Sequence, residues 1–177
     1  MTIPAKTHPI ISSTDEGLAT DSKNPRNHLK IINVEAIKLK IETSWHNTET
    51  PRDFKVLLLG VFRNALATGS EIIKKRFLEK NSGAETVLSQ AFLMDKIIQL
   101  AHETIVEKLY RAPNPTQGEQ LCIVAVGGYG RGELAPFSDI DLLFLLPYKT
   151  TPHVEHVVET MLYLLWDMRL KVGHSTR

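Results

Sequence analysis

The chain has 177 residues, of which 42% are hydrophobic and 23% are charged, and its net charge is +1. This balance is typical of a globular protein of one ordinary domain or slightly more, and the near-neutral charge argues against a nucleic-acid binder, which normally has a basic excess. The single cysteine, Cys122, excludes a disulfide framework and fits the reducing cytoplasm, where we expect the protein to be.

The N-terminus has no apolar stretch of the kind that signal peptides contain, and no apolar run approaches the ~20 residues that span a bilayer. We therefore expect no membrane association. Residues 1–28 are rich in Ser, Thr, Pro, Asp and Lys without periodicity, so we interpret them as a disordered tail. The next segment, "IINVEAIKLKI", fits either a strand or a helix.

Residues 29–115 are expected to be mainly helical. Thr50 and Pro51 form a helix start, and the apolar pattern runs to about residue 80, although Gly60 and Gly69 interrupt it. A second helix is predicted over residues 84–110, and we expect the two helices to pair as an antiparallel hairpin. The apolar positions at helical spacing in the first are Val56, Leu59, Phe62, Leu66, Ile73 and Phe77.

Residues 116–177 change character. The runs at 121–126 and 139–146 are continuously apolar apart from two acids, so they predict strands buried on both faces, with Cys122 in the core. A capped amphipathic helix begins at Thr151, and a third extended segment follows near the end of the chain. The expected fold class is α/β in the broad sense (α+β), a small mixed sheet with helices, preceded by the helical hairpin.

An acid pair lies at the start of the second strand, in "AVGGYGRGELAPFSDIDLLFLL". Asp139 and Asp141 are two residues apart, so their side chains point to the same face of the strand. Two carboxylates that close together raise each other's pKa or bind a cation, and Mg²⁺ prefers carboxylate oxygen. We therefore interpret Asp139 and Asp141 as catalytic metal ligands that could orient a nucleoside triphosphate. The alternative is a pair of solvated loop residues.

The glycine turn before this pair suits phosphate binding. Gly127 and Gly128 follow a strand directly, and glycine lets backbone N–H groups approach an anion closely. Arg131 and Ser138 could also contact a phosphate. For Arg131 a salt bridge to Glu133 is nearly as good an explanation, and Ser138 could merely stabilise the turn.

Other motif assignments fail on detail. No Lys-Ser or Lys-Thr follows the glycines, as a P-loop requires, and a strand begins too soon for a dinucleotide-binding crossover helix. Two leucines after Asp141 exclude an EF-hand. His153 and His156 lack a third metal ligand and are expected to be exposed, while Tyr129 and His174 are expected to serve structure.

The stretch "GGYGRGELAPFSDIDLLFL" resembles the signature of DNA polymerase β-type nucleotidyltransferases, a glycine turn followed by a D-x-D strand. Its longer wording is similar to the bacterial PII-protein uridylyltransferases, and so is "LWDMRLKVGHSTR" at residues 165–177. The clear resemblance covers residues 122–177. Glutamine synthetase adenylyltransferases share the glycine turn and S-D-I-D, but their turn usually lacks the Tyr-Gly-Arg-Gly-Glu-Leu wording.

This resemblance implies an incomplete polymerase β-like nucleotidyltransferase core. It also implies transfer of UMP from UTP to a tyrosine of the nitrogen-signalling protein PII, with Mg²⁺ as cofactor. Members of the family also remove UMP through a second hydrolase domain and sense glutamine through C-terminal domains. Because the family's third metal carboxylate has no counterpart before Arg177, we expect an N-terminal fragment that is inactive alone.

Three alternatives stay open. One is adenylyl transfer to another protein, since no residue in the stretch can be assigned to reading uracil instead of adenine. The second is a non-catalytic nucleotide-binding or regulatory module. The third is a truncated chain whose unfinished sheet, with an exposed edge, does not fold stably.

Overall fold

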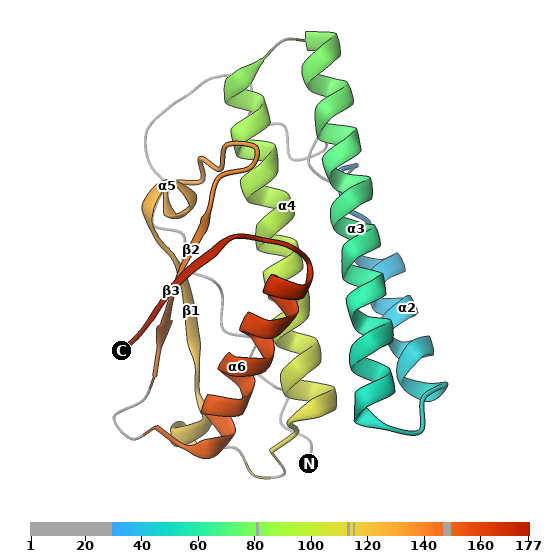
Figure 1. The fold of residues 1–177 in the computed structure, drawn as a ribbon, viewed down its shortest axis with the longest axis vertical. Helices are drawn as coiled ribbons and strands as arrows, with labels where there is room; N and C mark the ends of the chain where they lie inside the picture. The colour runs from blue at the N-terminus through green and yellow to red at the C-terminus, as the bar shows by residue number, and fades with distance from the viewer. Residues whose placement is uncertain (1–29, 81, 113, 115, 147–149) are drawn as a thin grey trace, which may run out of the picture.

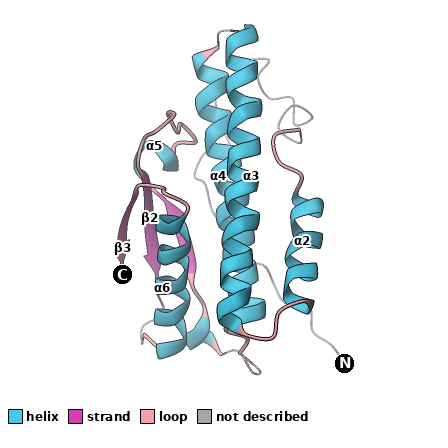
Figure 2. Cartoon of the chain, turned by 45° about the vertical axis from the view of Figure 1, so that its right-hand side comes forward, coloured by secondary structure: helices cyan, strands magenta, loops and turns pink. Residues whose placement is uncertain are grey.

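The structure, a computed structural model, describes residues 30–80, 82–112, 114, 116–146 and 150–177, so the tail expected at residues 1–28 lies outside the described residues. The elements form layers: α6 and α4 lie against the sheet, α3 lies beyond α4, and α2 is farthest from the sheet (Figures 1 and 2). In chain order the elements are α2 (Val34–His46), α3 (Pro51–Lys80), α4 (Gly83–Thr104), the π-helical segment η1 (Ile105–Leu109), the 3-10 turn η2 (Gln117–Glu119), β1 (Cys122–Ala125), α5 (Gly127–Gly130), β2 (Ile140–Leu145), α6 (Pro152–Asp167) and β3 (Val172–Thr176).

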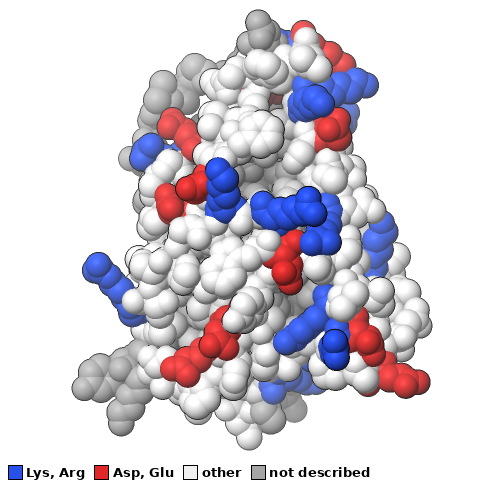
Figure 3. All heavy atoms as spheres, viewed as in Figure 1, with Lys and Arg blue, Asp and Glu red and all other residues white. Residues whose placement is uncertain are grey.

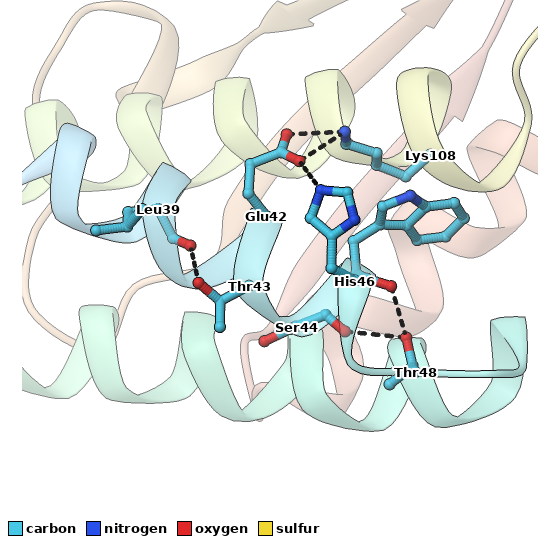
Figure 4. A network of polar contacts seen from close by, with 8 residues as sticks. Leu39, Glu42, Thr43, Ser44, His46, Thr48 and Lys108 are labelled. Carbon is cyan, nitrogen blue, oxygen red and sulfur yellow. Dashed lines mark hydrogen bonds and ion pairs between the residues drawn. The ribbon is translucent and has the colours of Figure 1, made fainter.

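The segment that fitted either a strand or a helix is the helix α2. Its N-cap is Asn33, whose side-chain oxygen accepts the Ala36 N–H at 3.0 Å. The far end of α2 is fixed by Glu42, whose carboxylate oxygens lie 2.7 and 3.0 Å from Nζ of Lys108 in η1 (Figure 4). His46 Nε2 lies 3.9 Å from the same carboxylate. This ion pair joins α2 to η1, the segment that continues α4, so it links the outer layer to the middle one.

Helices α3 and α4 form the expected hairpin, and α3 is continuous through both glycines. Gly69 has a packing reason, since a Cβ there would lie 2.6 Å from Cδ1 of the buried Leu93 on α4. At Gly60 a Cβ would meet no atom within 4 Å, so packing does not require a glycine at this position.

The apolar stripe proposed for α3 was partly wrong. Val56 is 66% exposed, and Phe77 is also exposed. The continuous apolar run let several stripes fit a 3.6-residue period, and contact with α2 and α4 selects another one. The buried residues of α3 are Phe54, Leu58, Phe62, Gly69 and Ile73.

Among the described residues one helix, α3, is long and apolar enough to cross a membrane by length and composition, and 22% of its apolar stretch is buried. This is weak support for a membrane segment, because helices of soluble proteins meet the same test.

Arg63 in α3 donates from Nε to the backbone oxygen of Asp167 at 3.1 Å, and this hydrogen bond joins α3 to the end of α6.

The sheet has the order β1-β2-β3, with β1 antiparallel and β3 parallel to β2. The parallel pair is connected through α6, which is the crossover that parallel strands require. Thr151 caps α6 by accepting the Val154 N–H at 3.4 Å, as the sequence predicted. The predicted small mixed sheet, preceded by a helical hairpin, is confirmed.

The prediction that β1 and β2 are buried on both faces was wrong. Burial alternates along β2 because α4 and α6 cover only one face of the sheet. Cys122 and Leu145 are register partners on the uncovered face, and Cys122 is only half-buried, which corrects its placement in the core. The buried strand residues, all on the covered face, are Ile123, Ile140, Leu142 and Phe144. Lys and Arg are interspersed with Asp and Glu on the face in Figure 3.

Candidate active site

The acid pair lies at the beginning of β2. Asp139 immediately precedes the strand, Asp141 is its second residue, and the buried Ile140 between them points to the helical layer. The two acids therefore face the uncovered side of the sheet, as strand alternation predicts. Lys171 Nζ lies 3.9 Å from Oδ1 of Asp139, but both side chains are mostly exposed, so this ion pair contributes little stability.

The Asp141 carboxylate lies in a slot between two glycines. A Cβ on Gly127, whose φ is +64°, would lie 2.9 Å from Oδ2 of Asp141. Gly173 is the register partner of Asp141 on β3, and a Cβ there would overlap Oδ1 of Asp141. Any larger residue at either position would displace the carboxylate. Sequence reasoning missed Gly173, although a glycine inside a strand often marks such a close approach.

The glycine turn is built directly on the strand that carries the acids. The Val126 N–H donates to the Asp141 backbone oxygen at 3.0 Å, and the Gly130 N–H donates to the Val126 oxygen at 2.9 Å. The one-turn helix α5 follows, and a Cβ on Gly130 would lie 2.6 Å from the Ala125 oxygen. The turn and the carboxylate of Asp141 are thus neighbours held by backbone hydrogen bonds.

Arg131 and Ser138 each have a partner within the loop. Arg131 Nη1 donates to the Gly127 oxygen at 3.0 Å, and its Nε lies 3.7 Å from Oε2 of Glu133. Ser138 Oγ donates to the Ala135 oxygen at 2.9 Å. Both residues are exposed, so contact with a phosphate would require each to exchange a local hydrogen bond for a new one.

Tyr129 serves packing as expected, and it also has a polar partner. Its ring is buried, and its hydroxyl donates to Oδ1 of Asp95 on α4 at 2.7 Å. Burial raises the pKa of Asp95 above its usual value, although this hydrogen bond acts in the opposite direction. Burial and the negative charge of Asp95 raise the pKa of Tyr129 far above its usual range, so its hydroxyl keeps its proton.

The histidines take part in ring contacts. His156 stacks on Tyr110 with centroids 5.8 Å apart, and His153 meets the same ring edge-on. His153 is half-buried, which corrects the expectation that it is exposed, because it packs against this ring. His174 contacts Trp166 edge-on at 5.9 Å. Within the described part of the chain, no group of three or more His, Cys, Asp and Glu could hold a metal ion.

The acid pair nevertheless fits a hard dication that takes most of its ligands from water and substrate. Two carboxylates on one face provide oxygen donors of the type that Mg²⁺ prefers. The slot between Gly127 and Gly173 leaves no room for a side chain beside Asp141. Asp139 and Asp141 are therefore the residues that would hold the ion.

A glycine turn that leads from one strand to an acid pair at the start of the middle strand of a small mixed sheet defines a nucleotidyltransferase with a polymerase β-like fold. The comparison with known families agrees. The chain belongs to the glutamate-ammonia ligase adenylyltransferase family, whose profile matches residues 63–165.

The chain is also similar to curated enzymes named bifunctional uridylyltransferase/uridylyl-removing enzyme, which confirms the resemblance drawn from the sequence. It is 45% identical to that of Azospirillum brasilense over 94% of this chain, 47% identical to that of Rhodospirillum rubrum over 83%, and 51% identical to that of Caulobacter vibrioides over 67%. The chain spans 18%, 16% and 13% of the length of these relatives. No solved structure matches it.

Proposed function

We propose that this chain supplies the nucleotide site of an enzyme that transfers UMP from UTP to a tyrosine of the signalling protein PII. The observation that carries the proposal is the Asp141 carboxylate, slotted between Gly127 and Gly173 and next to Asp139, directly after a glycine turn. The names of the similar enzymes support uridylyl as the transferred group.

In this proposal each part of the site has a separate role. The amides of Gly127 and Gly128 donate to the triphosphate, since those of residues 130–133 already donate within the turn. Arg131 neutralises phosphate charge after leaving the Gly127 oxygen. Asp139 and Asp141 hold Mg²⁺, which when bound would offset charge on the triphosphate and on the leaving pyrophosphate.

The chemical step is a displacement at the α-phosphorus of UTP. The tyrosine oxygen of the target forms a bond to this phosphorus while the bond to the bridging oxygen breaks, and pyrophosphate leaves. The tyrosine proton passes to solvent. The residues of this chain orient the triphosphate so that the α-phosphorus is open to attack.

The test uses the full-length enzyme, PII and labelled UTP. We expect Asp139→Asn and Asp141→Asn each to reduce PII labelling at least about 100-fold, because metal stabilisation of a transition state is worth several kcal/mol. Glu159→Gln, which removes an exposed carboxylate on α6, is the matched control and should label PII normally. Normal labelling by both aspartate variants would rule out the metal role.

The remaining assignments belong to the same proposal. The enzyme would act in the cytoplasm, and glutamine would be an effector of the full-length protein through parts outside this chain. The isolated chain would be inactive. Finding pyrophosphate release by the isolated chain would contradict that last statement.

The name of the matching family favours a second candidate, adenylyl transfer to another protein. Parallel labelling with UTP and ATP separates the two, since only the correct nucleotide should label its target protein. A non-catalytic nucleotide-binding module would instead bind UTP in a Mg²⁺-dependent manner in calorimetry, while the full-length protein releases no pyrophosphate.

A further inference from the structure

One side chain of the glycine turn reaches the helical layer. Tyr129 lies within α5, the residue is 4% exposed, and its hydroxyl donates to Asp95 Oδ1 at 2.7 Å. The two residues are 34 positions apart in the sequence. The contact therefore links the turn to α4, an element that the resemblance drawn from the sequence did not cover.

A second contact holds the same turn on the same helix. The Leu134 N–H donates to the Val87 oxygen at 3.2 Å, and the Leu134 side chain is buried. Val87 and Asp95 are about two turns apart along α4. Both ribbon views place α5 beside α4 (Figures 1 and 2). The loop is thus attached to α4 at two points, at Tyr129 within the turn and at Leu134 just after it.

Attachment to α4 adds to the hydrogen bonds within the turn, whose glycines leave the backbone free to move. Residues 127–132 include four glycines, which retain more backbone freedom than any other residue. Ordering a free loop during binding costs conformational entropy and weakens affinity. A buried tyrosine whose hydroxyl is hydrogen-bonded to a side chain on α4 restricts the loop before the ligand arrives.

We propose that Asp95 is a positioning residue for the phosphate site: by holding Tyr129, it fixes the amides of Gly127 and Gly128 where a triphosphate would bind. This inference rests on the proposed function, because it concerns the same site. It assigns the helical layer a role in nucleotide affinity.

The first test titrates UTP with Mg²⁺ into the chain and its variants by calorimetry. We expect Tyr129→Phe to bind roughly tenfold more weakly, since it loses the anchoring hydrogen bond. Asp95→Asn keeps an oxygen acceptor for the Tyr129 hydroxyl and should stay within about threefold of the natural chain. Tyr110→Phe is the matched control, because it removes a tyrosine hydroxyl that pairs with Thr160 Oγ1 at 3.0 Å elsewhere in the molecule.

Three results would overturn the inference. They are unchanged affinity in Tyr129→Phe, equal weakening in Tyr129→Phe and Tyr110→Phe, which would indicate general destabilisation, and failure of Asp95→Asn to retain affinity.

A second test needs no nucleotide. Amide hydrogen exchange at Gly130 and Gly132 should be at least roughly tenfold faster in Tyr129→Phe, with the amides of α3 unchanged. Unchanged exchange in the turn would overturn the inference. If the natural chain binds no UTP, the proposed function fails for this chain, and the exchange result still decides whether the hydrogen bond between Tyr129 and Asp95 fixes the turn.

Discussion

The backbone around Asp141 determines where its carboxylate lies. Its two carboxylate oxygens lie against two backbone positions that have no side chain, one in the turn and one on β3. Glycine at both positions leaves the space that the carboxylate occupies, and at Gly127 it also suits the positive φ. The slot therefore predicts that a single methyl group will disturb the site.

Gly173→Ala tests this slot. The new methyl would overlap Oδ1 of Asp141, so the carboxylate must rotate away from its position. We expect the affinity for UTP with Mg²⁺ to fall at least roughly tenfold, because a displaced ligand loses most of its interaction with the ion. Calorimetry measures this change. Gly60→Ala, which adds a methyl in open space, is the control, and equal affinities in the two variants would contradict the slot.

His102 on α4 makes stability depend on pH. Burial lowers its pKa from the usual 6.5, against a smaller opposing effect of Glu103. The unfolded chain then binds the proton at a higher pH than the folded chain. His102 therefore contributes stability that is present above about pH 6.5 and is lost as the pH falls through the lower folded pKa.

We expect His102→Gln to lose less unfolding free energy than the natural chain between pH 7 and pH 5. Urea titrations at both pH values measure the difference. His46→Gln is the control, because the His46 side chain is 77% exposed. Losses of the same size in all three proteins would contradict the assignment to His102.

At the scale of elements, the two glycines of α3 should respond in opposite directions. Gly60→Ala should raise the free energy of unfolding by about 1 kcal/mol, because alanine favours the helix and the methyl meets no atom within 4 Å. Gly69→Ala should lower it by about 1–3 kcal/mol, because the methyl overlaps the buried Leu93, whose side chain must then shift within the core. Denaturant titrations measure both changes. Stabilisation by both substitutions would show that α3 and α4 can separate without cost.

The elements that could be predicted from sequence are those with local signals. Thr50 and Thr151 were recognised as caps, and the apolar runs of β1 and β2 predicted strands. The helix α2 could not be separated from a strand, because its short pattern fits both periods until contact with α3 and Lys108 decides. The burial of only one sheet face also depends on the placement of α4 and α6.

The candidate site divides in the same way. Asp139, Asp141 and the glycine turn are close in sequence, so residue types and spacing were enough to predict a metal and phosphate site. Gly173 and Asp95 come from β3 and α4, and only the folded chain brings them to the turn. Gly173 allows the Asp141 carboxylate to lie close to β3, and Asp95 holds Tyr129 by a hydrogen bond. A short sequence motif contains neither kind of information.

At the scale of the whole molecule, buried residues from both the helical layers and the sheet form one continuous core. We expect a single cooperative unfolding transition, in contrast to the unstable fragment considered from the sequence. Two tryptophans can be used as fluorescence probes, one of the helical side of the core and one of the sheet side. Trp45 on α2 packs edge-on against Phe54, and Trp166 lies on α6 beside β3.

Single-tryptophan variants measure this cooperativity. Trp166→Phe leaves Trp45 as the probe of the helical side, and Trp45→Phe leaves Trp166 as the probe of the sheet side. In each variant, the urea midpoint from tryptophan fluorescence should coincide with that from circular dichroism. Separated transitions would show that the helical region and the sheet unfold independently.

Because β2 is the middle strand, the placement of the acid pair depends on the correct register between β2 and β3. A slip of β2 by one residue past β3 would place Ile140 or Leu142 opposite Gly173 and turn both acids toward the apolar helices. Misaligned chains would therefore lack the ion site altogether. On the proposed function, cation binding would select the one alignment of strands in which the enzyme can work, so the ligand would act as a check on assembly.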